Sequence, residues 1–352
     1  MNKILFYTMG LYKGGSERVI CNLANALINN YNITIVTNNK CESEYKLNDK
    51  IKHICIDDKK STLLSKISKK RTNKLYKIIK DENPDIIIAF LPEPTIRILS
   101  LKKHFKNKKI IVSIRNNPKY EFPFVFKYIR NYYYRFSDYI VVQSDSYNSF
   151  LPDKLKKKCV TIPNYVKKDF YNISCNKKEN IIVSVGRLEY QKNYKLLLKS
   201  FYKFNKKNPN YKLYIYGKGR EKKKLQKFIN NKKLNDKVIL KGTKENINEE
   251  IINSKIFILT SKYEGMPNCL LEAMSLGLPV ITTLSSPAIK DIIQNKVNGI
   301  IVKNNSNEIA SNIETLIDNK DYLDKISSNS RKVIDLYNEE NILEKWIKLI
   351  EK

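Results

Sequence analysis

Residues 256–281 read IFILTSKYEGMPNCLLEAMSLGLPVI, and this stretch indicates the fold of the whole chain. The apolar run Ile256–Thr260 predicts a short buried strand, and a second buried strand opens at Pro279. We expect a helix between them, because the side chain of Asn268 can cap its first turn and Gly277 can end it. A strand, a helix and a second strand in this order are typical of an α/β domain with a parallel sheet.

Two acidic residues flank the start of this predicted helix: Glu264 lies in the turn before it, and Glu272 lies about one turn inside it. The N-terminus of a helix offers unpaired N–H groups and a partial positive charge, which suit a phosphate group. Carboxylates repel phosphate, but they accept hydrogen bonds from vicinal hydroxyls. The combination therefore indicates a pocket for a sugar nucleotide. The alternative is an ordinary unit of sheet and helix whose two acids are solvated.

The string from Glu264 to Ile281 resembles the E-x7-E signature of the retaining GT-B glycosyltransferases of glycosyltransferase family 4. The resemblance implies that Glu272 holds the nucleotide ribose and that Glu264 contacts the donor sugar. It also implies that the first turn of the helix binds the donor through Asn268, Cys269, Leu270 and Leu271.

A second motif supplies candidate cations for a donor diphosphate. Residues 186–193 read GRLEYQKN, and they resemble the family's GR-x4-K segment, whose two cations clamp the diphosphate. The resemblance assigns that role to Arg187, which can bind as a fork, and to Lys192, which acts as a point charge. The usual glycine after the lysine is Asn193 here. Two ordinary solvated cations are the alternative.

Three glycines stand where bare backbone can approach a ligand. Gly15 lies in GGSER, which resembles the family's GGxE loop and implies a diphosphate contact. Gly217 belongs to a step that resembles the family's GxG. Gly242 lies in the segment where the family reads the nucleotide base through its backbone.

The first half of the chain departs from the family pattern at one catalytic position. The family often has a histidine in the loop after a buried strand, and this chain reads SIRNN at 113–117. We assign the equivalent position to Arg115 and expect it to act in catalysis. A histidine-based account of catalysis therefore does not carry over to this chain.

The fold class that follows is α/β, of the GT-B type, with two Rossmann-like domains facing each other across a cleft. A chain of 352 residues is long enough for two such domains. The expected parts are an acceptor-binding domain, a linker, a nucleotide-sugar-binding domain and a C-terminal helix returning to the first domain, at residues 1–165, 166–180, 181–335 and 336–352.

The formal net charge of +31 favours anionic partners, namely nucleic acid, a membrane surface or phosphorylated substrates. A Lys-rich amphipathic segment at 59–77 is either an ordinary surface helix or a helix lying on an anionic membrane. The aromatic and basic residues at 119–134 are ranked as core packing first, a membrane patch second and a nucleic-acid surface last. Scattered cysteines and the lack of an export signal favour the cytoplasm.

The resemblance implies transfer of a hexose or N-acetylhexosamine from a UDP-sugar, with retention, to a glycan carried on undecaprenyl diphosphate in bacterial surface polysaccharide biosynthesis. It implies no metal ion and no cofactor. We expect peripheral attachment to the cytoplasmic face of the cell membrane and no nucleic-acid partner. Two alternatives stay open: a non-transferring nucleotide-sugar enzyme such as an epimerase or hydrolase, and a basic nucleic-acid-binding protein.

Overall fold

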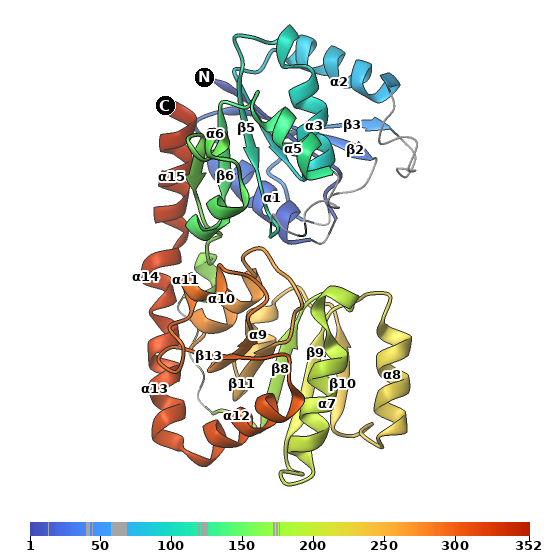
Figure 1. Cartoon of the computed structure of the whole chain (residues 1–352), viewed down its shortest axis with the longest axis vertical. Coiled ribbons are helices and arrows are strands. Elements are labelled where there is room, and N and C mark those ends of the chain that lie inside the picture. The colour runs from blue at the N-terminus through green and yellow to red at the C-terminus, as the bar shows by residue number, and fades with distance from the viewer. Residues whose placement is uncertain are drawn as a thin grey trace. The chain divides into compact units, whose positions relative to one another are not determined.

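The computed structural model describes residues 1–12, 14–39, 43, 45–57, 69–117, 120, 126–171, 173, 175 and 177–352. Contacts within the chain divide it into two units. The first unit comprises Met1–Pro163 and Leu343–Lys352, and the second comprises Asn164–Ile342. Both chain termini therefore belong to the first unit (Figure 1).

The first unit is built on a parallel sheet whose seven described strands run in the order β3-β2-β1-β4-β5-β6-β7. The strands are β1 (Lys3–Thr8), β2 (Asn32–Asn39), β3 (Lys52–Asp57), β4 (Ile86–Phe90), β5 (Lys109–Ser113), β6 (Tyr139–Val142) and β7 (Cys159–Thr161). The order reverses between β1 and β4. Open α/β sheets bind their ligands at the carboxyl ends of the strands that flank such a reversal.

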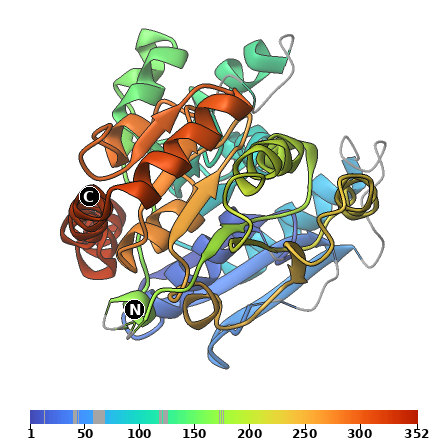
Figure 2. The same ribbon diagram turned by 90° about the horizontal axis from the view of Figure 1, so that it is seen from below.

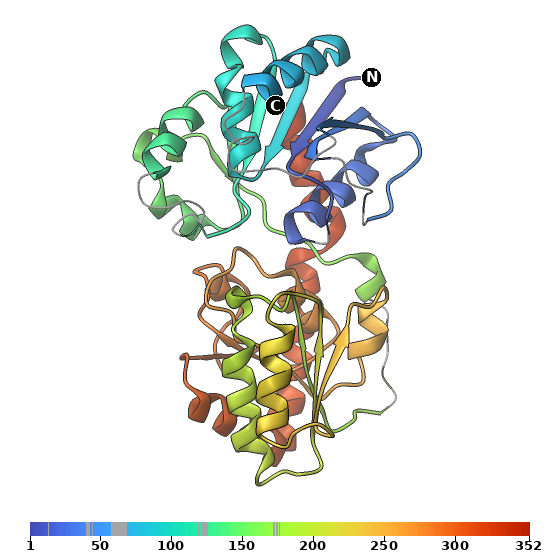
Figure 3. The ribbon, with the colours of Figure 1, turned by 90° about the vertical axis from the view of Figure 1, so that its right-hand side faces the viewer.

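Helices cover both faces of this first sheet (Figure 3). They are α1 (Gly15–Leu27), α2 (Lys69–Glu82), α3 (Pro92–Ser100), α5 (Phe126–Tyr134), α6 (Asp153–Lys156) and the C-terminal part of α15 (Glu339–Glu351), with short 3-10 helices at Lys102–His104 and Asp145–Phe150. The helical spacing of apolar residues in α1 places Val19, Leu23 and Leu27 in the core.

The second unit repeats the architecture with six described parallel strands in the order β10-β9-β8-β11-β12-β13. The strands are β8 (Ile181–Val185), β9 (Lys212–Tyr216), β10 (Val238–Gly242), β11 (Ile256–Leu259), β12 (Val280–Thr283) and β13 (Ile300–Val302). Here the order reverses between β8 and β11. These are the strands that precede the GR-x4-K and E-x7-E segments.

The helices of the second unit also lie on both faces of its sheet. They are α7 (Tyr194–Asn205), α8 (Lys222–Asn231), α9 (Ile247–Ile251), α10 (Asn268–Ser275), α11 (Ile289–Ile292), α12 (Ser306–Asp318), α13 (Lys320–Arg331), α14 (Val333–Tyr337) and the first residues of α15, with short 3-10 helices at Lys168–Phe170 and Tyr190–Lys192. Helices α7 and α12 pack side by side (Figure 2). Figure 3 shows α8 next to α7.

Strand β11 explains why the opening stretch is a continuous apolar run rather than an alternating one. Ile256 and Ile258 pack in the core beneath α7 and α12, and Phe257 and Leu259 pack in the core beneath α10. A strand that is buried on both faces has no polar side to show.

The two ends of α10 are formed by different means. Pro267 occupies the N-cap position, so the prediction that Asn268 caps the helix is wrong: the helix begins at Asn268 itself, and no side-chain cap is formed. The C-terminal prediction is confirmed. Gly277 has φ 69°, and the amides of Gly277 and Leu278 donate to the carbonyls of Met274 and Ala273, which is a Schellman motif.

The predicted α/β fold class is confirmed, because each unit is a parallel Rossmann-like sheet flanked by helices. Two sequence predictions fall partly outside the described residues. Residues 58–68 of the Lys-rich segment are not described, and neither are residues 118, 119 and 121–125 of the aromatic one. In the described part of the Lys-rich segment, the apolar side chains of Leu75 and Ile79 are buried in the first unit.

Candidate active site

The second sheet brings two predicted motifs to one edge. Arg187 and Lys192 follow β8, and Glu264 follows β11, and these two strands are neighbours in the sheet. Since both strands run in the same direction, the loops after them emerge at the same end. The reversal of strand order between β8 and β11 makes this the expected ligand-binding edge of the second unit.

Lys192 and Glu264 form a nearly buried ion pair at this edge. The ammonium Nζ of Lys192 lies 2.7 Å from Oε1 of Glu264, and the two side chains are 12% and 10% exposed. The hydroxyl of Ser261 donates to the same carboxylate oxygen at 2.7 Å. The amide of Gln191 donates to the other oxygen, Oε2, over a longer 3.4 Å. Glu264 is therefore held mainly through Oε1, and Oε2 keeps capacity to accept further hydrogen bonds.

The charge of Lys192 is maintained by its surroundings. Burial alone would lower the pKa of its ammonium, but the carboxylate of Glu264 holds that pKa above its ordinary value. Cys269 and the hydroxyl of Tyr194 are also close enough to act on the charge of Lys192. Cys269 is the second residue of α10, so Lys192, Glu264 and the start of α10 lie together.

Two features hold the backbone around Lys192 in place: the conformation of Asn193 and the hydrogen bonds of Thr260. Asn193 has φ 52° and ψ 41°, a left-handed conformation in which glycine and asparagine are the favoured residues. The departure from the family's glycine is thus accommodated, because asparagine tolerates the same backbone shape. In addition, the hydroxyl of Thr260 donates to the carbonyls of Lys192 and Asn193 at 3.1 and 3.2 Å.

Gly217 is required by close backbone contact, whereas Gly242 is required by conformation alone. A Cβ atom on Gly217 would lie 2.0 Å from the carbonyl oxygen of Gly186, which is too close for any side chain. A Cβ on Gly242 would meet no atom within 4 Å, but its φ of 71° disfavours other residues. The two positions are linked, since the amide of Gly217 donates to the carbonyl of Gly242 at 2.6 Å.

The first turn of α10 is less open than the sequence suggests. The amides of Leu270 and Leu271 donate to the carbonyl of Pro267 at 3.1 and 3.4 Å, so both are already engaged. The side-chain oxygen of Asn268 is buried and has no hydrogen-bond partner among the described residues. Unused hydrogen-bonding capacity at this end of α10 therefore includes the Asn268 side chain.

The other two predicted residues of this unit differ in exposure. Glu272 is buried in α10, with 6% of its surface exposed. Arg187 is exposed, and among the described residues no ion pair is formed by its guanidinium. The structure therefore brings Lys192 and Glu264 into contact and leaves Arg187 in solvent.

Sequence reasoning missed the residues that orient Glu264. Ser261 binds its carboxylate, Gln191 binds both that carboxylate and the carbonyl of Tyr263, and the carbonyl of Ser285 accepts from its amide. The spacing Ser261-x-x-Glu264 is a local signal, because the two residues are three apart in the loop after β11. The contact with Ser285 has no such signal, since Ser285 lies in the loop after the next strand, β12.

In the first unit, Arg115 follows β5 and Gly15 is the first residue of α1. The guanidinium carbon of Arg115 lies 5.1 Å from the ring centre of Phe90 and 5.4 Å from that of Trp346. Burial lowers the pKa of Arg115 below its ordinary value. The guanidinium is thus a cation held against two aromatic rings at the carboxyl end of the sheet.

A buried polar network lies at the same edge of the first sheet. The hydroxyl of Tyr7 on β1 donates to Asn38 on β2 at 2.6 Å, and Asn38 donates to Oε2 of Glu93 at the start of α3. Arg97 binds the other oxygen of Glu93 through Nε at 3.0 Å. Burial, with the charge of Glu93, raises the pKa of Tyr7. This network fixes the start of α3 next to the ligand-binding edge, and it was not predicted from the sequence.

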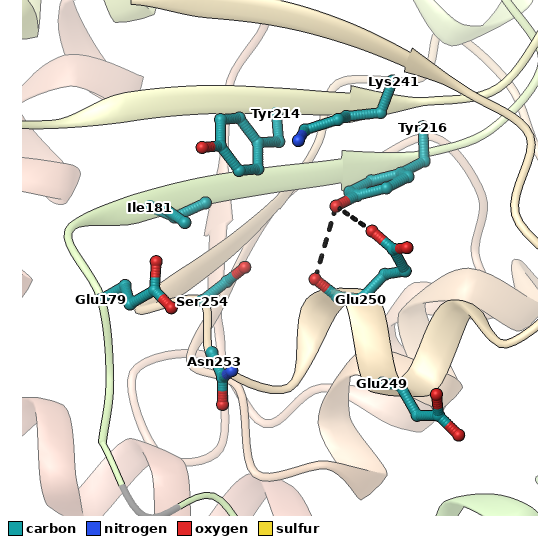
Figure 4. Close-up of a pocket in the computed structure, with 9 residues that line it drawn as sticks. All are labelled: Glu179, Ile181, Tyr214, Tyr216, Lys241, Glu249, Glu250, Asn253 and Ser254. Atoms are coloured by element: carbon teal, nitrogen blue, oxygen red, sulfur yellow. Dashed lines mark hydrogen bonds between the residues drawn. The ribbon is translucent and has the colours of Figure 1, made fainter.

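A pocket on the second unit is lined by residues other than those predicted for the site (Figure 4). It is lined by Glu179, Ile181, Tyr214, Tyr216, Lys241, Glu249, Glu250, Asn253 and Ser254. Its polar groups pair with one another: Tyr216 donates to Glu250 at 3.0 Å, and the ammonium of Lys241 lies 4.3 Å from the ring centre of Tyr214. None of the predicted site residues lines it, so the sheet edge with Lys192 and Glu264 is the better candidate for the active site.

Two family models match the chain: glycosyl transferases group 1 over residues 167–333, and glycosyl transferase 4-like over residues 11–144. The chain is a glycosyltransferase with a group 1 domain. The family predicted from the E-x7-E string is thereby confirmed, and with it the prediction that the chain is a glycosyltransferase.

Two bacterial relatives match this glycosyltransferase over nearly its whole length. The GalNAc-α-(1→4)-GalNAc-α-(1→3)-diNAcBac-PP-undecaprenol α-1,4-N-acetyl-D-galactosaminyltransferase of Campylobacter jejuni is 28% identical over 356 residues, covering 99% of this chain and 98% of the relative. The amylovoran biosynthesis glycosyltransferase AmsD of Erwinia amylovora is 27% identical over 360 residues, covering 98% and 99%.

Solved structures share the fold. HepE of Anabaena in complex with UDP and glucose has a TM-score of 0.84 at 16% identity, with all of both chains covered. TarM of Staphylococcus aureus has a TM-score of 0.83 at 19% identity, covering 100% of this chain and 99% of TarM. These likenesses agree with the two Rossmann-like units of the group 1 glycosyltransferase described above.

Proposed function

We propose that this glycosyltransferase moves a hexose or N-acetylhexosamine from a UDP-sugar, with retention of configuration, to a glycan carried on undecaprenyl diphosphate. The biological role we propose is bacterial surface polysaccharide biosynthesis. The observation that carries the proposal is the buried pair of Lys192 and Glu264 beside the start of α10, because it sets a cation and a carboxylate side by side. A cation for phosphate next to an acceptor for hydroxyls is what a sugar nucleotide requires.

Each residue of this edge has a role in the proposal. Lys192 and Arg187 bind the donor diphosphate, together with the positive end of the α10 dipole. The amides of Leu270 and Leu271 already donate to Pro267, so they are not given this role. Glu264 binds a hydroxyl of the donor sugar through Oε2, because Oε1 is already occupied by Ser261 and Lys192. Glu272 binds the ribose, and Gly217 and Gly242 let the backbone approach the nucleotide. In the first unit, Gly15 and Arg115 are proposed to contact phosphate groups of the substrates.

The chemistry is dominated by charge on the leaving group. As the glycosidic bond breaks, negative charge develops on the β-phosphate, and preorganised cations and N–H groups lower the barrier by stabilising it. Glu264 already balances the charge of Lys192. The ammonium of Lys192 still donates to the diphosphate, and Arg187 and the N-terminus of α10 add positive charge that Glu264 does not balance. In this proposal no metal ion takes part, so chelation with EDTA leaves turnover unchanged.

The choice of donor and acceptor is supported by what the similar proteins are named for. HepE is described in complex with UDP and glucose, and TarM in complex with UDP. The Campylobacter relative is named for an undecaprenol-linked substrate and for transfer of N-acetyl-D-galactosamine, and AmsD is named for amylovoran biosynthesis. The names of the two solved structures support a UDP-sugar as the donor, and the name of the Campylobacter relative supports a lipid-linked glycan as the acceptor.

A lipid-linked acceptor requires access to a membrane surface. Among the described residues, no helix is long and apolar enough to cross a bilayer. Exposed lysines of α2, namely Lys69, Lys70 and Lys77, lie on the first unit, and we propose that they attach the enzyme peripherally to the cytoplasmic face of the cell membrane. Since Leu75 and Ile79 are buried, α2 has no free apolar face there to insert. Attachment through this part of the helix is therefore electrostatic.

The proposal is tested by measuring the thermal unfolding midpoint of the chain with UDP, GDP, ADP and CMP. A ligand that binds only the folded chain raises its stability, so UDP is expected to give the largest shift. The best UDP-sugar is then offered with a polyprenyl-diphosphate-linked glycan, and the product anomer is assigned by NMR. Nucleotide release with no acceptor product would favour a hydrolase, and an altered sugar nucleotide would favour an epimerase. Indifference to all nucleotides, with salt-sensitive binding of nucleic acid, would favour the nucleic-acid alternative.

A further inference from the structure

The C-terminal segment Leu343–Lys352 is anchored to the first unit by contacts from several strands. The indole of Trp346 stacks on Phe90, at the end of β4, with ring centres 6.3 Å apart and planes 28° apart. The ammonium of Lys109, at the start of β5, donates to the carbonyl of Ile350 at 2.6 Å. Trp346 is 1% exposed and Phe90 is fully buried. This segment is therefore part of the core of the first unit rather than an appendage.

Both rings of this stack face the same cation. The guanidinium carbon of Arg115 lies 5.1 Å from the ring centre of Phe90 and 5.4 Å from that of Trp346. The faces of aromatic rings attract cations, and this attraction grows when water is excluded. A guanidinium has several rotatable bonds behind it, so two ring contacts restrict where it can lie. Phe90 pairs with Ser113 in the sheet. The stacked rings of Phe90 and Trp346 therefore lie directly beside the loop that carries Arg115.

We propose that Phe90 and Trp346 are positioning residues for Arg115, so that the C-terminal segment completes the substrate site of the first unit. This inference rests on the proposed function, in which Arg115 contacts a phosphate group of a substrate. The rings make no bond to the substrate themselves. They keep the guanidinium at the carboxyl end of the sheet and exclude water from one side of it, which strengthens its interaction with an anion.

A double-mutant cycle tests whether Trp346 acts through Arg115. Trp346→Leu and Trp346→Phe are each made in the parent chain and in the Arg115→Ala variant, and kcat and KM are measured for transfer from the best UDP-sugar. In the parent chain we expect Trp346→Leu to lower kcat by about tenfold, while Trp346→Phe, which keeps a ring, stays close to the parent. In the Arg115→Ala background, Trp346→Leu should cause less than about a twofold further loss, because the group it positions is gone.

Loss of packing alone is controlled by Phe201→Leu, which removes a fully buried ring from the core of the second unit. That variant should unfold at a lower temperature with kcat of the folded enzyme unchanged. Equal losses of kcat on Trp346→Leu with and without Arg115 would overturn the positioning inference while leaving the role of Arg115 intact. An Arg115→Ala enzyme with parental kcat and KM would instead remove Arg115 from the proposed function.

The contact itself has a readout that does not depend on activity. Trp346 is the single tryptophan of the sequence, so the intrinsic fluorescence of the chain reports on its surroundings. Removing the guanidinium in Arg115→Ala should shift the emission of Trp346. Lys195→Ala, which removes an exposed cation from α7 in the second unit, should leave the emission unchanged. An unshifted spectrum in Arg115→Ala would contradict the contact on which the proposal depends.

Discussion

The ammonium group of Lys192 lies 2.7 Å from Oε1 of Glu264, and both side chains are almost entirely buried. Each charge is therefore the main compensation for the other in a place with little water. A substitution that removes one of them changes two properties at once. It removes a group proposed to bind the donor, and it leaves a buried charge without its partner.

Lys192→Ala is expected to lower turnover by roughly two to three decades, because it removes a cation that stabilises the leaving diphosphate. The same variant should lose about 3–5 kcal/mol of unfolding free energy, since Glu264 is left buried and uncompensated. Turnover is measured under saturating donor, and stability is measured by urea unfolding. Near-parental turnover would remove Lys192 from the mechanism.

A second substitution separates the two effects. Adding Glu264→Gln to Lys192→Ala removes the uncompensated charge, so part of the lost stability should return while turnover stays low. Lys195→Ala provides the matched control, because Lys195 is an exposed lysine on the neighbouring turn of α7. It should leave turnover unchanged and the free energy of unfolding within about 0.5 kcal/mol of the parent.

The pH dependence of this pair follows from the raised pKa of Lys192. A lysine whose pKa is higher in the folded chain contributes stability that is complete below its unfolded pKa, here near 10.5, and is lost as the pH rises through the folded value. The difference in unfolding free energy between the parent and Lys192→Met should therefore be constant from about pH 7 to pH 10. Urea unfolding at several pH values measures this. Without the pair, burial would lower the pKa of Lys192, and the difference would instead change in favour of the parent between pH 7 and pH 10. That result would show that the pair does not form in solution.

Gly217 and Gly242 should differ sharply in their tolerance of alanine. Gly217→Ala brings a Cβ atom to 2.0 Å from the carbonyl oxygen of Gly186, so the ends of β8 and β9 must separate. We expect a loss of at least about 3 kcal/mol of unfolding free energy. Gly242→Ala meets no atom within 4 Å and should lose only the strain of a left-handed alanine, about 1–2 kcal/mol. Equal losses in urea unfolding would contradict this reading of the two glycines.

The sequence was sufficient to predict those features that depend only on residues close together along the chain. The apolar run of β11, the ending of α10 at Gly277 and the family motifs all follow local rules of periodicity and spacing. The cap of α10 shows the limit of those rules. Asn268 is a favoured capping residue, but the chain places Pro267 at the N-cap position, with φ −75° and ψ 110° and no side-chain cap.

Contacts between distant residues could not be predicted in the same way. The approach of Lys192 to Glu264 depends on β8 and β11 being neighbours, which is a property of the sheet order rather than of either motif. The stack of Trp346 on Phe90 depends on where the C-terminal helix packs. The family resemblance predicts that this helix returns to the first domain, but not which residues it meets there. Periodicity identifies the buried face of an element, and topology decides what that face meets.

Membrane attachment through α2 is expected to depend on the position of its charges and not only on the net charge of the chain. Each exposed lysine near an anionic surface contributes about 1 kcal/mol, so reversing Lys69, Lys70 and Lys77 to Glu should abolish most binding to anionic liposomes at low salt. The matched control reverses Lys222, Lys223 and Lys224 on α8, which are exposed lysines of the second unit. Flotation at low and high salt measures both variants. An equal loss in the two variants would show attraction by net charge alone, and full binding by the α2 variant would exclude α2 as the attachment surface.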